Sequence, residues 1–440
     1  MTKAEFLTKT PVPELIIKLS VPTIISMLVT GIYNTADTYF VGKISTQATA
    51  AVGIVFSVMA IIQALGFFCG HGSGNCLARQ LGAGNREKAA EMASTGFAVS
   101  IILGIIVAAA GIIFIRPLAE LIGATPTTMK DTTDYMRIIL LGAPFMMGQF
   151  VMNNQLRFQG SAVYAMAGLM CGAVINLILD PLLILGFKTG VPGAAVATVC
   201  GQIVSFLVLL IGTRHGENIR FSLKNIRIEP AFIIEIINGG SPSLFRQGLA
   251  SVSTLLLNHA AGSIGGDAAI AGMSIVTRIM MLTLAAVIGF GQGYQPVCSF
   301  NYGAKLYARV KEGFFFCIRY NVLFLCFAAA LCLIFSGNII GLFRDDPEVI
   351  AIGSDALRYQ AFSLPLMGVI TMANMMLQST GKGIKASITS SARNGIFFIP
   401  LILILPRFFG LTGVEITQPV ADLLTVTLAL PLALSELKKM

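Results

Sequence analysis

The stretch AVYAMAGLMCGAVINLILDPLLILG, residues 162–186, decides the class of fold. It is apolar over more than the roughly 20 residues that a helix needs to cross the hydrocarbon core of a bilayer. Its one charged side chain, Asp180, would cost at least about 2.5–3.5 kcal/mol at the bilayer centre, so it must face protein or water rather than lipid. Asn176 precedes Asp180 by four residues and shares its helix face. Pro181 has no backbone N–H, which frees a carbonyl one turn earlier as a ligand for a cation or water.

The composition of the whole chain agrees with a membrane protein. The chain has 440 residues, of which 12% are charged and 55% are hydrophobic, and its mean hydropathy is +0.81. Soluble domains carry roughly 25% charged residues. So few charges could not cover a soluble protein of this size, which excludes a cytosolic enzyme, a secreted disulfide scaffold and a disordered protein. The eight cysteines lie mostly in apolar runs without a CxxC motif, so we interpret them as reduced, apolar side chains.

Twelve apolar stretches follow one another along the chain. Each is continuous rather than alternating, which favours helices over a β-barrel. The sequence therefore predicts an all-α polytopic membrane protein with twelve transmembrane helices. The predicted spans are residues 15–40, 47–70, 92–115, 135–157, 162–186, 191–212, 232–258, 268–292, 313–335, 358–378, 385–405 and 412–432.

Basic residues are distributed unevenly between the predicted loops. With the N-terminus in the cytoplasm, twenty Lys and Arg residues lie inside, eight lie outside, and two, Arg246 and Arg278, lie within spans. Because cytoplasmic loops are enriched in Lys and Arg, we expect both termini to face the cytoplasm, in the inner (cytoplasmic) cell membrane. The same loops account for the net charge of +9, so membrane lipid rather than nucleic acid is the expected partner.

The two halves of the chain resemble each other at an offset near 220 residues, which indicates an internal duplication. The recurring elements are Ser20-Val-Pro22 as Gly240-Ser-Pro242, Pro144 as Pro365, Gln159-Gly160 as Thr380-Gly381, and Val191-Pro-Gly193 as Leu411-Thr-Gly413. The predicted division is an N-terminal lobe of helices 1–6 (residues 1–213), a cytoplasmic linker (214–230) and a C-terminal lobe of helices 7–12 (231–440). Six helices per copy give both copies the same orientation, so the pseudo-symmetry axis should follow the membrane normal and the binding site should lie between the lobes.

Three acids fall well inside predicted spans, namely Asp37, Asp180 and Asp422. Asp37 shares a polar helix face with Thr30 and with Tyr33 or Asn34. Two carboxylates in one partly dry cavity cannot both ionise at low cost, so Asp37 and Asp180 form a candidate site that binds and releases a proton. The alternative is a pair of structural acids that neighbours hydrogen-bond.

Two further acids, Glu235 and Glu415, lie near predicted span ends. We expect water to reach both of them there, so that each is an ordinary charged residue at the membrane–water interface without a special function.

Polar stripes follow several spans at helical spacing. Span 6 carries Thr198, Gln202 and Ser205, and span 12 carries Gln418, Asp422 and Thr425 at an offset of 220. Further polar stripes include Asn258 in span 7, Asn374 in span 10, and Asn153 and Asn154 in span 4. Together they indicate a wet central cavity, while hydrogen bonding between helices is the alternative for any single stripe.

The order of these motifs resembles the MATE (multidrug and toxic compound extrusion) transporters over essentially the whole chain, and within them the DinF-like bacterial and archaeal branch. The segments that carry the resemblance are Tyr33-Asn-Thr-Ala-Asp-Thr-Tyr-Phe-Val-Gly42, Arg157-Phe-Gln-Gly160, Asn176-Leu-Ile-Leu-Asp-Pro-Leu-Leu-Ile-Leu-Gly186, Val191-Pro-Gly-Ala-Ala195 and Gly410-Leu-Thr-Gly413. The resemblance implies two pseudo-symmetric six-helix bundles in a V. It also implies a secondary antiporter that exports organic, often cationic, drugs or toxic compounds in exchange for H⁺ or Na⁺, with coupling in the N-terminal lobe.

The resemblance also assigns site residues. Asp37 and Asp180 match the two acids of the coupling site in that branch. Asn176 matches its amide residue, and Thr198 matches its hydroxyl residue on the sixth span. The resemblance also implies that Asp37, Asp180 and Asn176 would be the ligands of a Na⁺ ion. The other branch uses acids in spans 7 and 10, where this chain has Asn258 and Asn374, which disfavours a sodium site in the C-terminal lobe. From the stripes and the resemblance together, the predicted substrate-cavity residues are Tyr33, Asn34, Tyr135, Asn154, Gln202, Asn258, Asn374 and Asp422.

Two other functions are alternatives to export. A flippase for a lipid-linked precursor would need a basic cavity, and the two arginines predicted within spans argue against it. An enzyme is disfavoured because the three histidines form no HExxH motif, and the Gly-rich stretch Gly70-His-Gly-Ser-Gly74 is interpreted as a flexible or close-packed helix end. No cofactor is expected besides the coupling ion, and we expect the protein to act as a monomer.

Overall fold

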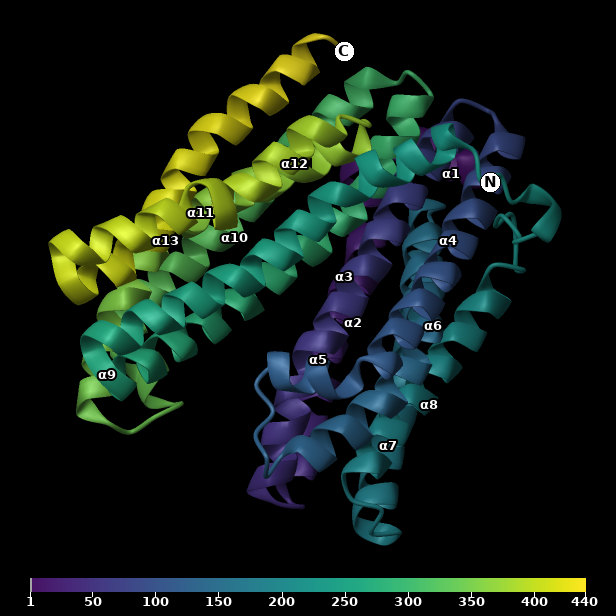
Figure 1. The fold of residues 1–440 in the computed structure, drawn as a ribbon. Coiled ribbons are helices and arrows are strands. Elements are labelled where there is room, and N and C mark those ends of the chain that lie inside the picture. Colours follow the sequence, from purple (N-terminus) through teal and green to yellow (C-terminus); the bar gives the residue numbers. More distant parts are fainter. Residues whose placement is uncertain (1) are drawn as a thin grey trace.

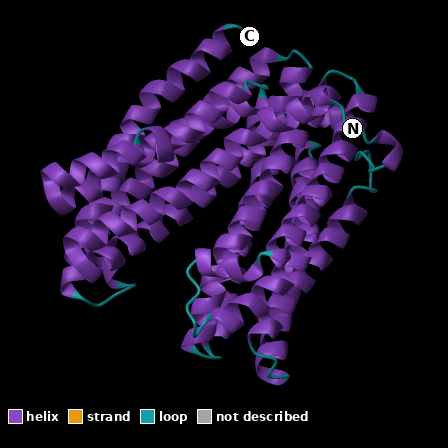
Figure 2. Cartoon of the chain, viewed as in Figure 1, coloured by secondary structure: helices purple, strands orange, loops and turns teal. Residues whose placement is uncertain are grey.

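The computed structural model describes residues 2–440, except for the side chains of residues 32–36 and 38. The described part is helical throughout, with short loops (Figure 2). The elements are α1 (Lys3–Lys9), α2 (Val12–Gly42), α3 (Thr46–Gly82), α4 (Arg86–Ile113), α5 (Ile115–Leu121), α6 (Met129–Phe158), α7 (Ala162–Pro181), η1 (Leu182–Gly186), α8 (Val191–Gly212), η2 (Leu223–Asn225), α9 (Pro230–Gly303), α10 (Tyr307–Gly341), α11 (Pro347–Ser379), α12 (Gly383–Ser391), η3 (Ala392–Ile396) and α13 (Phe398–Lys438).

Twelve membrane-crossing segments result from these elements. Ten helical stretches of the described residues are long and apolar enough to cross a membrane. Two of them are really two helices each, because α9 bends at Gly266 (φ 62°) and the stretch from α12 to α13 bends at Gly410 (φ 57°). The stretch 162–186 is one span, in which α7 continues past Pro181 into the π-helical turn η1. The predicted all-α fold with twelve transmembrane helices is thus confirmed.

The glycine-rich segment Gly70–Gly74 corrects one prediction, because it lies inside α3 and not at a helix end. Helix α3 extends to Gly82, twelve residues beyond the predicted end of the second span. Close packing explains why the helix continues: a Cβ on Gly72 would lie 2.3 Å from the carbonyl oxygen of Ile236, and one on Gly74 would lie 2.3 Å from the ring of Phe158. Tertiary contacts therefore outweigh the low helix propensity of glycine here.

The helices form two bundles that together resemble a V (Figure 1). The N-terminal bundle comprises α2–α8, and the C-terminal bundle comprises α9–α13. The bundles meet at the end that holds both chain termini, mainly through α3 against α9 and α2 against α9, and part at the opposite end. We refer to these two ends as the closed end and the open end.

Backbones touch directly where the bundles meet at the closed end. A Cβ on Gly82 would lie 2.0 Å from the carbonyl oxygen of Phe300, and a Cβ on Gly303 would lie 2.0 Å from that of Arg79. Small residues of this kind allow membrane helices to approach closely. The contact therefore depends on the absence of side chains on both helices.

Polar side chains reinforce the same contact. Arg79 Nη2 donates to Glu235 Oε2 at 2.6 Å, and Ser299 Oγ donates to Asn75 Oδ1 at 2.9 Å. Both bonds join α3 to α9, so they can form only while the bundles are together at the closed end.

The internal duplication is visible in the backbone as well as in the sequence. Gly190 (φ 67°) precedes the sixth span and Gly410 (φ 57°) precedes the twelfth, at an offset of 220. Gly160 (φ 75°) and Gly381 (φ 79°) form a second pair, after the fourth and tenth spans. Positive φ is a conformation in which glycine is favoured over residues with a side chain. Both copies therefore retain a glycine at these corresponding positions.

Replacing Gly410 with Ala should lower stability by about 1–3 kcal/mol, because alanine at this φ is strained. No heavy atom lies within 4 Å of the added Cβ, so the effect is one of backbone strain and not of packing. Gly248→Ala is the matched control, since Gly248 is helical and its Cβ site is equally open. Thermal unfolding in detergent should show a lower midpoint for Gly410→Ala only; equal midpoints for the two variants would contradict the account.

Candidate functional site

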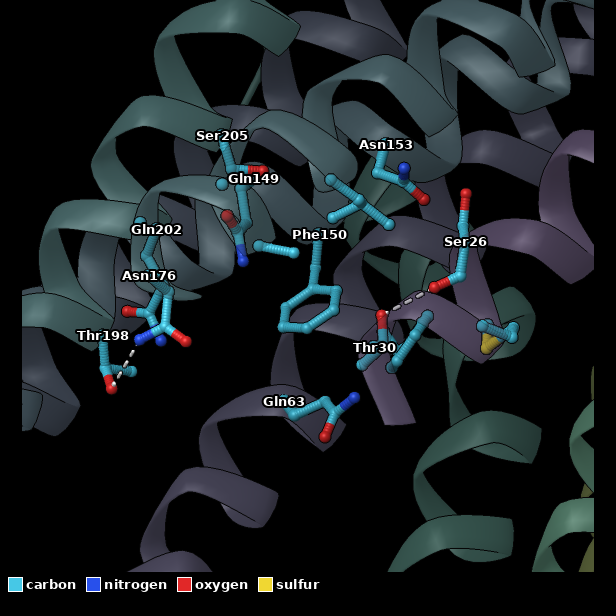
Figure 3. A pocket seen from close by; sticks show the side chains of 16 residues that line it. Ser26, Thr30, Gln63, Gln149, Phe150, Asn153, Asn176, Thr198, Gln202 and Ser205 are labelled. Atoms are coloured by element: carbon cyan, nitrogen blue, oxygen red, sulfur yellow. Dashed lines mark hydrogen bonds between the residues drawn. The ribbon is translucent and has the colours of Figure 1, made fainter. Parts of the chain in front are cut away.

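The candidate site begins on α7, where Asn176 and Asp180 share one face of the helix. Both are buried, with 3% and 0% of their surface exposed. The Asn176 amide donates from Nδ2 to Asp180 Oδ1 and to Thr198 Oγ1 of α8, each at 3.5 Å. Figure 3 shows Asn176 turned toward Thr198 across the space between α7 and α8. One amide thus links the carboxyl group to the neighbouring helix.

Asp37 of α2 completes the group from a second helix. Its carboxyl group lies close enough to that of Asp180 for the two to interact. A hydrogen bond between two carboxyl groups requires a proton on one of them. Three buried oxygens, Asp37 Oδ1, Asp180 Oδ2 and Asn176 Oδ1, accept no hydrogen bond within the described part of the chain. The group can therefore accept a proton or offer oxygen ligands to a small cation.

A small cavity of about 60 Å³, bordered by polar and apolar side chains, lies beside this group inside the N-terminal bundle. Asn176 and Thr198 border it, together with Ser26 and Thr30 of α2 and Gln63 of α3 (Figure 3). The polar stripe predicted on the sixth span faces this cavity, since all three of its members are among the bordering residues. The stripe therefore lines space as well as joining helices.

The predicted cavity residues divide into groups. Gln202 borders the N-terminal cavity and Asn374 borders a second cavity, in the C-terminal bundle. Asn258 is half-buried and Tyr135 fully buried, and neither borders a described cavity.

The side chains of Tyr33 and Asn34 lie outside the described residues. Their predicted place in the substrate cavity therefore stays a prediction.

Asn154 does not face a described cavity as predicted, because it serves another buried side chain. Its carbonyl oxygen Oδ1 accepts from Arg157, whose guanidinium also donates to Gln292 of α9. Arg157 is only 2% exposed, and a buried guanidinium needs such acceptors. Asn154 therefore belongs to a contact between the two bundles.

The predictions for Asp422 and Glu415 also need correction. Asp422 lies behind the cavity wall and not in it: Oδ1 accepts from Arg393 Nε at 2.8 Å and from Gln418 at 2.9 Å. Its other oxygen accepts from Ser363 at 3.2 Å. Glu415 is 5% exposed, so it is not the water-exposed interfacial residue that its position suggested. It lies near the start of the twelfth helix, five residues after the bend at Gly410, but neighbouring protein covers it there.

The C-terminal cavity has a volume of about 390 Å³ and is bordered by basic side chains, one of which was not counted within a span. Arg246 and Arg393 both border it. Counting only Arg246 and Arg278 within spans was wrong, because Arg157 and Arg393 also lie inside helical spans. Both arginines fall within predicted spans, 135–157 and 385–405, so the sequence already indicated that they lie in the membrane region.

These features define a class of protein. Two bundles of membrane-crossing helices meet at one end, part at the other, and each encloses a cavity lined by both polar and apolar residues. This is the architecture of a multi-pass membrane transporter, with its sites between repeats and within their helices.

The chain belongs to the MatE family. The MatE family model matches residues 22–182 and 242–404, one match in each half and again 220 residues apart. The resemblance to MATE transporters is thereby confirmed, and the protein is a transporter and not an enzyme.

Curated relatives and solved structures agree with this assignment. The chain is 29% identical to the multidrug export protein MepA of Staphylococcus haemolyticus, over 93% of this chain and 91% of the relative. It is 27% identical to MepA of Staphylococcus aureus, over 97% and 94%. An outward-facing multidrug resistance MATE transporter of the MOP superfamily is 26% identical with a TM-score of 0.92, over 100% of this chain and 98% of that one. A MOP superfamily transporter from Pyrococcus furiosus, described as having a binding pocket of reverse polarity, is 25% identical with the same score and coverage.

Proposed function

We propose that this protein is a secondary active antiporter that exports organic compounds, often cationic ones, in exchange for H⁺ or Na⁺. The observation that carries the proposal is the pairing of Asp37 and Asp180, two interacting carboxyl groups in the membrane region with unsatisfied oxygens. Ionisable groups at such depth mark ion pathways by default. The MepA relatives bear the name of multidrug export proteins, which supports a drug-like substrate.

Either coupling ion fits the same group of residues. A proton would be shared between the two carboxyl groups, since like charges so close cannot both remain ionised at low cost. A Na⁺ ion would take oxygens of Asp37, Asp180 and Asn176 as ligands. In both cases the ion and the substrate must compete or favour opposite states of the transporter, because a ligand shifts a conformational equilibrium only by its differential affinity.

The orientation and assembly form part of the proposal. We place both termini, and hence the closed end, in the cytoplasm and the protein in the inner membrane, so that the V opens outward. The lobes are residues 1–213 and 231–440 with the linker 214–230 between them, and the protein acts as a monomer. The outward-facing relative of similar fold supports this arrangement.

Efflux of an organic cation such as ethidium from proteoliposomes tests the proposal. A ΔpH and a Na⁺ gradient should be imposed separately, each at zero membrane potential. We expect one of the two gradients to drive efflux above the level of protein-free vesicles. Equal efflux with either gradient, with both and with none would contradict antiport.

Asn176→Leu should reduce gradient-driven efflux at least about tenfold, because a hydrogen bond to a charged group is worth about 1.5–3 kcal/mol. Leucine has the same branching, with methyl groups in place of the amide oxygen and nitrogen, and cannot donate to Asp180 or Thr198. The control is Asn258→Leu, the same change at a half-buried position that borders neither cavity. Equal efflux by both variants would show that the amide plays no part in coupling.

Flipping of a lipid-linked precursor is a second candidate that one observation favours. Arg246 and Arg393 border the C-terminal cavity, so the shortage of basic residues no longer argues against an anionic head group. A flipping assay with a fluorescent isoprenoid diphosphate in proteoliposomes separates the two functions. Translocation of that lipid in the absence of any ion gradient would favour the flippase over the antiporter.

A further inference from the structure

The cavity of the C-terminal bundle has the size and walls of a small-molecule site. At about 390 Å³ it falls within the range of ligand pockets, roughly 300–1,000 Å³. Helices α9, α11, α12 and α13 supply its walls, and much of its lining is apolar. Met280, Met281, Leu284 and Met367 form part of that surface, and methionine adapts to ligands of varied shape.

The charge of this cavity is positive. Arg246 and Arg393 border it, and no Asp or Glu does so among the described residues. Arg393 is neutralised by Asp422, which is 1% exposed and already accepts from two other donors. Arg246 has no ion pair within the described part of the chain, and its one hydrogen bond runs to Asn374 Oδ1 at 3.4 Å. A guanidinium has five N–H donors, so most of the donors of Arg246 have no hydrogen-bond acceptor within the described part of the chain and remain for a ligand in the cavity it borders.

The duplication shows that this cavity corresponds to the one beside Asp180. Ser26 and Ala173 border the N-terminal cavity, and 220 residues later Arg246 and Arg393 border the C-terminal one. Thr198 and Gln418 are related in the same way. The two repeats therefore keep a cavity in the same place and differ in its charge. The N-terminal copy adjoins two carboxyl groups, whereas the C-terminal copy carries an unneutralised guanidinium.

We propose that the C-terminal cavity binds an amphiphilic organic anion. Its carboxylate, sulfonate or phosphate group would accept from Arg246, because a guanidinium fork matches such groups, and its apolar body would lie against the methionine-rich wall. The anion is either a soluble compound or the head of an anionic lipid. This assignment of a substrate class rests on the proposed function only for the export step, since binding itself requires no gradient.

A matched pair of fluorescent probes tests the proposal. Dansyl-β-alanine is an anion and N-dansylethylenediamine a cation, with the same fluorophore and similar size. Binding to the protein in nanodiscs of zwitterionic lipid is measured by anisotropy without any gradient, with empty nanodiscs subtracted. The chain has no tryptophan, so a Met280→Trp variant adds a single reporter, whose emission is quenched by energy transfer most strongly when a dansyl group binds in the cavity beside it.

We expect the anion to bind and to quench the new tryptophan. Arg246→Gln should weaken anion binding at least about tenfold, as expected when a charged hydrogen-bonding partner is lost, and Arg246→Lys should restore much of it. Arg278→Gln is the matched control in the second part of α9, beyond the bend at Gly266, where an exposed arginine outside the cavity should have no effect. Cation binding that is unchanged by Arg246→Gln confirms that this variant is folded. Anion binding no stronger in wild type than in Arg246→Gln, or no quenching, would overturn the proposal.

A competition step distinguishes the two sources of the anion. Displacement of the probe by short-chain phosphatidylglycerol but not phosphatidylcholine identifies a lipid head group, and displacement by neither identifies a soluble anion. Loss of coupling at Asp37 or Asp180 leaves these binding results unchanged. Failure of anion binding likewise leaves gradient-driven export of cations intact, so the two proposals fail separately.

Discussion

Asp180→Asn is expected to reduce gradient-driven efflux to the level of protein-free vesicles, and Asp37→Asn should do the same. The two carboxyl groups interact directly, and Asp180 is completely buried. Asparagine has almost the same shape but cannot bind and release a proton, and it removes the negative charge that attracts a cation. Because the two acids act as one group, the double variant should be no more impaired than either single variant.

The control for these variants is Asp267→Asn. It makes the same chemical change at an exposed acid next to the bend of α9, far along the chain from the carboxyl pair. Efflux by this variant should match that of the wild type. Undiminished efflux in both Asp37→Asn and Asp180→Asn would rule out the proposed coupling site.

Gly82→Val should prevent closure of the two bundles at the end that holds the termini. The new side chain would begin 2.0 Å from the carbonyl oxygen of Phe300, which belongs to a helix backbone and cannot rotate away. Overpacking costs about 1–3 kcal/mol even where neighbouring side chains relax, so the structure with this end closed should become a minor state. Gly303→Val should have the same effect from the opposite helix, since its Cβ would lie 2.0 Å from the carbonyl oxygen of Arg79.

Distances between spin labels at the open end measure this effect. Labels at Thr127→Cys and Asp267→Cys, with the accessible Cys171, Cys200 and Cys326 replaced by Ala, report the separation of the bundles. Both glycine variants should lose the long distances and lose transport. Gly53→Val is the control on α3, where no atom lies within 4 Å of the added Cβ. A wild-type distance distribution in Gly82→Val would show that the glycine contact does not control closure.

The membrane fold could be predicted from sequence because a continuous apolar segment in lipid must satisfy its backbone hydrogen bonds internally, which a helix does. The spacing of Asn176 and Asp180 likewise fixed their common face, which the structure retains as a hydrogen bond. The bends at Gly266 and Gly410 could be placed only by packing, since the chain holds 45 glycines and most of them are helical or in ordinary turns.

The surroundings of single polar residues were harder to predict. Asn154 and Asp422 have the chemistry of cavity residues, but each is taken up by an arginine, Arg157 and Arg393 respectively. Asp422 and Arg393 lie on different elements, and Arg157, three residues after Asn154 on α6, is held by Gln292 of the other bundle. Sequence spacing does not define contacts of this kind between separate helices. The charge of the C-terminal cavity could not be predicted for the same reason. It depends on which of the bordering arginines already has an acid partner.

Substrate affinity measured as a function of pH and of Na⁺ concentration tests the central claim most directly. The protein is held in nanodiscs without a gradient, and ethidium binding is compared for the wild type and Asp180→Asn. The account predicts that the coupling ion weakens substrate binding to the wild type, because ion and substrate compete or favour opposite states. It also predicts that the same dependence disappears in Asp180→Asn. An identical ion dependence in both proteins would contradict coupling at the Asp37 and Asp180 pair.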